Sequence, residues 1–208
     1  MKNNRIFRYF FIVFVLITVC SCSKKFVGKD YTLDLGKNLT YKNSDGVKVK
    51  LDLSEYINGE ISVFEDKSNV FIVSASKGII KMSAKDGKIC WKQKIASIPQ
   101  RNLSFDEKYV YFTSIDNKFY ILNYENGETE FIYYTYSSER SLMNNVKPII
   151  YKNAIVVVFG NGETIIFDKK TKKVLKKLPR KEIFDDSVIV ENGILKMNDE
   201  NILDLNKL

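Results

Sequence analysis

The feature that most constrains the fold of this 208-residue chain is a repeat with a period near 40 residues. Residues 70–91 overlay residues 110–131 at an offset of 40 without a gap, and residues 155–175 overlay the second copy at an offset of 45. A fourth copy begins at residue 187 and breaks off. A period of this length is typical of architectures in which each repeat is one supersecondary unit that stacks on the next.

Each copy predicts four short β-strands. β-Branched and aromatic residues dominate the copies, and no sustained helical periodicity follows the N-terminal segment. The apolar runs at residues 70–73 and 155–159 predict inner strands that are covered on both faces. A short strand is expected before each copy, at residues 61–64, 103–105, 148–151 and 188–190.

Four strands per 40 residues predict an all-β fold of propeller-type blades, with an ordinary β-sandwich as the alternative. Residues 60–208 hold about three and a half to four such blades, which makes an open or partial propeller. The dipeptides Asp86-Gly87 and Asn126-Gly127 predict type I′ hairpin turns, because that turn needs positive φ at both central residues.

The N-terminus predicts an export signal. Lys2, Arg5 and Arg8 precede an apolar run at residues 9–19, which is too short for a comfortable transmembrane helix and fits the hydrophobic region of a signal helix. The run ends at Val19-Cys20-Ser21-Cys22, which resembles a bacterial lipobox. An uncleaved anchor helix and a plain secreted protein are the alternatives.

Cys22 fits the lipidated position better than Cys20, because the small Ser21 precedes it. We therefore predict a signal peptide at residues 1–21 and a lipidated linker with leading strand(s) at residues 22–59. A diacylglycerol thioether and a further acyl chain such as palmitate would give stable membrane anchoring. The absence of Asp at position 23 favours sorting to the outer membrane, with the chain facing the periplasm.

One repeat carries a recognisable signature. Gly78, Asp86, Gly87 and Trp91 resemble the pattern of quinoprotein-type, PQQ-like propeller repeats, whose outer-strand Trp packs on the neighbouring blade. The second repeat keeps Gly127 and has Phe131 in place of the Trp. The third has Lys172 and Leu175 at the corresponding places.

With the lipobox, this pattern resembles the BamB family of lipoproteins. The resemblance implies a non-catalytic periplasmic scaffold that binds the central subunit of the outer-membrane β-barrel assembly machinery. A generic binding lipoprotein with another protein partner and a remnant of a quinoprotein dehydrogenase are the alternatives. No nucleic-acid partner is expected, because the signal exports the chain.

Composition argues against catalysis. The chain has no His, which removes Ser-His-Asp and Cys-His triads and the commonest metal ligand. Quinoprotein dehydrogenases would require carboxylates converging on calcium, whereas acids such as Asp106, Asp116 and Asp168 are scattered. We predict no catalytic residue, metal or cofactor, and we expect Cys90 to pack as a small apolar residue beside Trp91.

Two segments are candidates for contact with partners. The five extra residues between the second and third copies fall within residues 137–146, where Arg140, Leu142 and Met143 form a candidate partner-binding loop. A merely tolerated insertion is the alternative. A basic cluster without acids, read either as a solvated strand edge or as a contact for anionic head groups, contains Lys169, Lys170, Lys172, Lys173, Lys176, Lys177, Arg180 and Lys181.

An unclosed array of blades leaves apolar faces and strand edges bare. Closure is therefore expected from residues 26–59, from self-association or from a partner.

Overall fold

The computed structural model describes residues 25–27, 31–34, 38–42, 48–52, 61–66, 69–74, 78–95, 102–135, 146–180 and 187–208. The chain divides into two compact units, Met1–Leu53 and Ser54–Leu208. Cys22, the predicted signal helix and the loop residues Arg140, Leu142 and Met143 lie outside the described residues. None of the described helices is long and apolar enough to span a membrane.

The first unit contains a four-stranded antiparallel sheet in the order β1-β2-β3-β4. Its central hairpin pairs Leu33 with Leu39, and Leu39 in turn pairs with Leu51. These strands do not overlay the 40-residue repeats, so the sequence indicated only leading strands here. The strands are β1 (Lys25–Val27), β2 (Tyr31–Asp34), β3 (Asn38–Lys42) and β4 (Lys48–Asp52).

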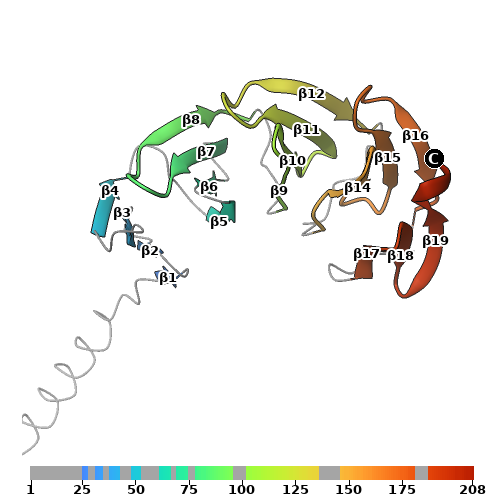
Figure 1. The fold of residues 1–208 in the computed structure, drawn as a ribbon, viewed down its shortest axis with the longest axis horizontal. Coiled ribbons are helices and arrows are strands. Elements are labelled where there is room, and N and C mark those ends of the chain that lie inside the picture. The colour runs from blue at the N-terminus through green and yellow to red at the C-terminus, as the bar shows by residue number, and fades with distance from the viewer. Residues whose placement is uncertain are drawn as a thin grey trace, which may run out of the picture. The chain divides into compact units, whose positions relative to one another are not determined.

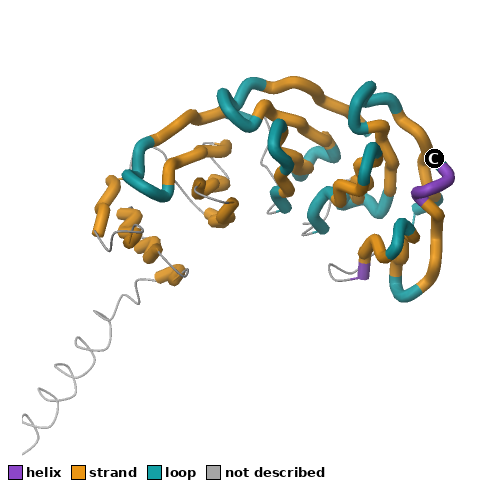
Figure 2. The backbone as a smooth tube through the Cα atoms, viewed as in Figure 1, coloured by secondary structure: helices purple, strands orange, loops and turns teal. Residues whose placement is uncertain are grey.

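The second unit contains four antiparallel sheets, here called blades 1 to 4, which follow one another in chain order (Figure 1, Figure 2). Blade 1 consists of β5 (Ile61–Asp66), β6 (Asn69–Ser74), β7 (Gly78–Ser83) and β8 (Ile89–Gln93). Blade 2 consists of β9 (Ser104–Phe105), β10 (Tyr109–Thr113), β11 (Lys118–Asn123) and β12 (Thr129–Tyr134).

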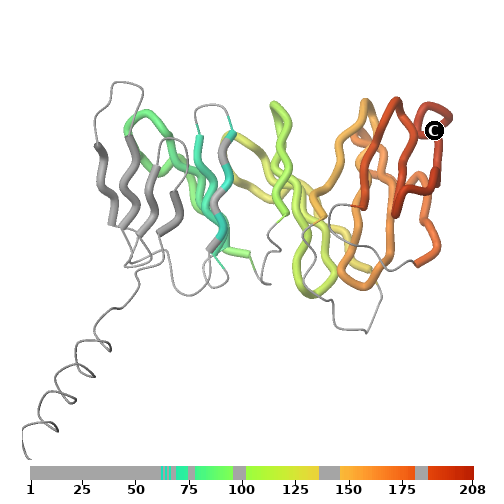
Figure 3. The backbone as a smooth tube through the Cα atoms, turned by 90° about the horizontal axis from the view of Figure 1, so that it is seen from below, coloured from blue at the N-terminus to red at the C-terminus, as the bar shows by residue number. Residues whose placement is uncertain are grey.

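Blade 3 consists of β13 (Ile149–Tyr151), β14 (Ala154–Val158), β15 (Thr164–Asp168) and β16 (Val174–Leu178). Blade 4 has the three strands β17 (Val188–Glu191), β18 (Ile194–Met197) and β19 (Glu200–Asp204), followed by the short 3-10 helix η2 (Leu205–Lys207). The predicted all-β fold of three and a half to four propeller-type blades is confirmed, down to the incomplete fourth copy. Figure 3 shows blades 2 to 4 in the same chain order, from green to red.

Strand alternation places each inner strand between two cores. In β10, Val110 and Phe112 pack in the core shared with blade 1, whereas Tyr111 packs in the core shared with blade 3. β14 repeats the pattern, with Ile155 in the core shared with blade 2 and Val156 in the core shared with blade 4. The prediction that the apolar inner strands are covered on both faces is therefore confirmed.

The predicted type I′ turns are wrong at both dipeptides. Gly87 and Gly127 have positive φ, but Asp86 and Asn126 do not. Each glycine instead ends a longer turn, in which its N–H donates to the carbonyl of the residue four positions earlier, at 2.9 Å in both blades. Lys172 (φ +61°) occupies the same place in blade 3.

The outer strand of each complete blade carries a β-bulge that corrects the alignment of the third repeat. Lys81 pairs with Trp91, Ile121 with Phe131 and Ile166 with Lys176. The counterpart of Trp91 in blade 3 is therefore Lys176. Leu175 corresponds instead to the bulge residue Cys90.

Candidate functional site

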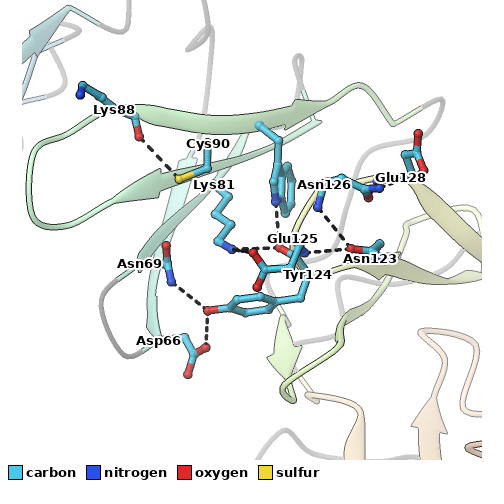
Figure 4. A network of polar contacts seen from close by, with 11 residues as sticks. Asp66, Asn69, Lys81, Lys88, Cys90, Asn123, Tyr124, Glu125, Asn126 and Glu128 are labelled. Atoms are coloured by element: carbon cyan, nitrogen blue, oxygen red, sulfur yellow. Dashed lines mark hydrogen bonds and ion pairs between the residues drawn. The ribbon is translucent and has the colours of Figure 1, made fainter.

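The contact between blades 1 and 2, here called interface 1/2, is organised around the main chain of Tyr124. The Trp91 indole Nε1 donates to the Tyr124 carbonyl oxygen at 2.9 Å, and the Lys81 Nζ donates to the same oxygen at 3.0 Å. Both donors come from the outer half of blade 1, and both side chains are buried. A carbonyl at the end of β11 is thus held by two donors of the preceding blade (Figure 4).

The Tyr124 side chain points back into blade 1. Its hydroxyl donates to Asp66 Oδ2 at 2.7 Å and accepts from Asn69 Nδ2 at 3.0 Å (Figure 4). The Lys81 ammonium lies 3.8 Å from the centre of the Tyr124 ring. Burial, followed by the hydrogen bond to the Asp66 carboxylate, raises the pKa of Tyr124 above its ordinary value, so the phenol stays protonated and remains a donor.

Gly127 completes this interface. A β-carbon at position 127 would lie 2.6 Å from two atoms of the Trp91 ring, and φ there is +76°. Trp91 is 7% exposed. The structure therefore brings together Trp91 and Gly127, two residues of the repeat signature that belong to different blades.

The other signature residues have local roles. Gly78 (φ +94°) lies where a β-carbon would be 2.2 Å from the Gln93 carbonyl oxygen. Asp86 is exposed and its Oδ1 accepts from the Lys88 N–H. Phe131 is half-buried and contacts Phe119 and Phe167 edge-on.

Interface 2/3, between blades 2 and 3, uses the same positions with different chemistry. Lys169 stands where Tyr124 stands in blade 2, and Asp106 where Asp66 stands in blade 1. The Lys169 ammonium forms an ion pair with Asp106 at 2.7 Å, and the Tyr111 hydroxyl donates to the same carboxylate at 2.6 Å. Burial pushes the pKa of Asp106 up, but these two donors and the N–H groups of Lys108 and Tyr109 outweigh it, so the pKa lies below its ordinary value.

In interface 3/4, between blades 3 and 4, the acceptor is the side-chain amide of Asn206 and not a carboxylate. The Tyr151 hydroxyl donates to Asn206 Oδ1 at 3.1 Å, and Lys152 Nζ donates to the same atom at 2.7 Å. Leu205, in the position of Tyr124, is buried in the shared core. These contacts between blades were not predicted from the sequence, although Asp66 and Asp106 are separated by the repeat offset of 40 residues.

Cys90 is exposed, which contradicts the expectation that it packs beside Trp91. It is the bulge residue of β8. The thiol contacts the Lys88 carbonyl at 3.8 Å (Figure 4).

The described residues do not form the cluster of carboxylates that a calcium site of the quinoprotein dehydrogenase type would require. In the described part of the chain, no group of three or more Asp, Glu, Cys or His side chains could hold a metal ion. Asp106 and Asp168 are bound instead to their own neighbours, Asp106 to Lys169 and Asp168 to Thr171. The described geometry supports rigid stacking of blades.

Comparisons with known proteins agree with this fold. No curated protein sequence matches the chain. The crystal structure of BamB from Moraxella catarrhalis matches with a TM-score of 0.64 and 14% identity, over 88% of this chain and 61% of that chain. A europium-containing methanol dehydrogenase matches with a TM-score of 0.51 and 12% identity, over 66% of this chain and 28% of that chain.

At these identities the solved structures show the fold alone. The chain spans about three fifths of the length of the Moraxella BamB chain, of which it covers 61%. A family model described as "outer membrane protein assembly factor BamB" matches residues 37–182, a range that includes blades 1, 2 and 3. The chain therefore belongs to this BamB family of PQQ-like repeat proteins.

Proposed function

We propose that this protein is a non-catalytic, lipid-anchored scaffold that faces the periplasm and assists the assembly of outer-membrane β-barrel proteins. The observation that carries the proposal is the family match over residues 37–182. Three interlocked blade interfaces, each with a buried apolar core, support a role in presenting fixed edges and loops to a partner.

The role in barrel assembly is tested by depleting the protein from its own cells. The amount of folded, heat-modifiable β-barrel protein in the outer membrane is expected to fall and to recover when the wild-type gene is supplied. Unchanged barrel levels and unchanged assembly rates in depleted cells would refute the role.

The lipid anchor is proposed at Cys22. Cys22→Ala is expected to abolish incorporation of labelled palmitate and to release the chain from the membrane fraction. Cys20→Ala is the matched control, because it removes a thiol two residues away and should leave labelling intact. Equal palmitate labelling of both variants would mean that Cys22 is not the lipidated residue.

The partner is proposed to contact the loop that carries Arg140, Leu142 and Met143. Replacing residues 137–145 by a short Gly/Asn turn is expected to abolish co-purification with the barrel-forming subunit. Glu107→Lys changes the charge of an exposed turn in the same blade and serves as the control. Retained co-purification of the loop variant would exclude this loop as the contact.

Self-association is proposed as one route to closing the array. Within the described residues, β19 pairs only with β18, and a strand edge of this kind can pair with another chain. Light scattering of the purified chain across a concentration series tests this. A monomer at all concentrations would assign closure to a partner or to another segment.

A further inference from the structure

We propose that the outer strand of blade 3 is a contact surface for an anionic lipid bilayer. The surface consists of Lys170, Lys173 and Lys176 with Val174 and Leu175, and is called the basic strip below. The inference is independent of the barrel-assembly role.

The basic strip lies at the edge of its sheet. β16 is the last strand in the order β13-β14-β15-β16, and every residue from Val174 to Lys177 is exposed. Val174 and Leu175 are 37% and 42% exposed, which places two aliphatic side chains in water between lysines. Exposed aliphatic groups beside cations suit a membrane interface, where the head groups meet the acyl chains.

The neighbouring lysines of the turn are already used by the fold, and this separates them from the basic strip. Lys169 is paired with Asp106 at 2.7 Å. Lys172 donates to the Lys169 carbonyl at 2.7 Å and lies 4.1 Å from the Tyr109 ring centre. By contrast, no described carboxylate forms an ion pair with Lys170, Lys173 or Lys176, so their charge is directed outward.

Asp168, the described acid closest to the strip in sequence, is bound within its own turn. Asp168 accepts hydrogen bonds from the Thr171 N–H and hydroxyl and from Asn153, and these donors lower its pKa. Lys177 follows the strip, with its ammonium 5.8 Å from the Tyr133 ring centre. The cations directed outward from the strip are therefore Lys170, Lys173 and Lys176.

A bilayer fits this edge better than an added peptide strand does. Lysines along an edge strand discourage strand pairing, because an incoming strand would have to approach a row of cations. A membrane surface needs no main-chain pairing. Each cation near an anionic leaflet is expected to strengthen the contact about fivefold.

The test uses the full chain carrying Cys20→Ser, Cys22→Ser, Cys90→Ser and Leu175→Cys, with an environment-sensitive nitrobenzoxadiazole label on position 175. The apolar run at residues 9–19 is expected to attach this chain to vesicles of any composition, so the readout is the environment of the label and not binding. With phosphatidylcholine and phosphatidylglycerol vesicles we expect a blue shift and quenching by lipid-borne spin labels. With phosphatidylcholine alone we expect neither.

The chain offers a matched control in Cys90, which occupies the same bulge position on the outer strand of blade 1. A label there, with Leu175 retained, is expected to show no shift. Combining K170Q, K173Q and K176Q with the label at 175 should abolish the shift, because three lost cations weaken the contact about 100-fold. Far-ultraviolet circular dichroism and Trp91 emission report whether the variant is folded.

Three results would overturn the proposal. These are an equal shift with uncharged vesicles, an equal shift at Cys90, and a shift that survives in the folded triple variant. A shift produced by poly-glutamate or inorganic phosphate without vesicles would also overturn it and would assign the basic strip to an acidic polypeptide or a free anion.

Discussion

Trp91 in blade 1 and Lys176 in blade 3 occupy the same position on the outer strand, yet Trp91 is 7% exposed and Lys176 lies on the surface. Both pair with the third strand directly beside a β-bulge, so the main chain is equivalent. In blade 1 this position closes against the next blade, and in blade 3 it faces solvent. The repeats therefore share a main-chain register, while the residue at this position is a buried Trp in blade 1 and an exposed Lys in blade 3.

The largest expected effect tests this difference directly. Trp91→Ala should lower the free energy of unfolding by about 3–5 kcal/mol, because it empties a buried site against Gly127 and removes a donor to the Tyr124 carbonyl. Lys176→Ala should change it by less than about 0.5 kcal/mol. Urea unfolding followed by circular dichroism measures both changes. Equal losses of unfolding free energy would mean that the two positions contribute equally to stability.

Gly127→Ala ranks next, at about 2–4 kcal/mol of lost stability. A β-carbon there lies 2.6 Å from the Trp91 ring and must accept a φ of +76°, so overpacking and strain in the left-handed region add. In a Trp91→Ala background the clash is gone and about 1 kcal/mol of strain should remain. Additive losses across this double-mutant cycle would show that the two residues do not act through contact.

Tyr124→Phe should cost about 1–3 kcal/mol, because Asp66 and Asn69 each lose a partly buried partner. Tyr111→Phe is the counterpart at interface 2/3 and should cost less, because Asp106 keeps Lys169 and two main-chain donors. Unfolding followed by the emission of Trp91, the only Trp in the chain, reports interface 1/2. A larger loss for Tyr111→Phe would reverse the proposed ranking.

The smallest effect is a pH dependence. The pKa of Asp106 is lowered in the folded state from an ordinary value of 3.8, so its contribution to stability is present above that value and is lost as the pH falls through the lower folded value. Asp106→Asn should therefore flatten the decline of the unfolding free energy below about pH 4. Glu107→Gln, on the exposed turn beside it, is the comparison, and an identical flattening there would deny Asp106 a special role.

Much of the fold could be predicted from the sequence. The repeat offset and the apolar inner strands correctly indicated stacked four-stranded units, whereas the turn dipeptides marked the right positions with the wrong turn type. The expectation for Cys90 was wrong because it is the bulge residue of β8 and is exposed. Leu175 was aligned with Trp91 by mistake, since both the offset of 45 from Phe131 and the strand register assign that place to Lys176.

The inter-blade contacts were beyond sequence reasoning. Tyr124 and Asp66 are 58 residues apart, and the position of Tyr124 is filled by Lys169 in blade 3 and by Leu205 in blade 4. The offset of 45 residues aligns Tyr124 with Lys169, but a phenol, an ammonium and an aliphatic side chain share no pattern that would predict a common contact. At residues 22–59 the sequence predicted only leading strand(s) and not a complete four-stranded sheet, because the strands at Lys25–Asp52 do not overlay the repeat.

The proposed role as a scaffold for outer-membrane β-barrel assembly is tested most directly by capture of the assembly machinery. The full chain is purified from detergent-solubilised membranes of its own cells, and the barrel-forming subunit is quantified beside it. We expect that subunit in near-equal amount with the wild-type chain and strongly reduced with the variant in which residues 137–145 are replaced. A folded wild-type chain that captures none of it would contradict the account.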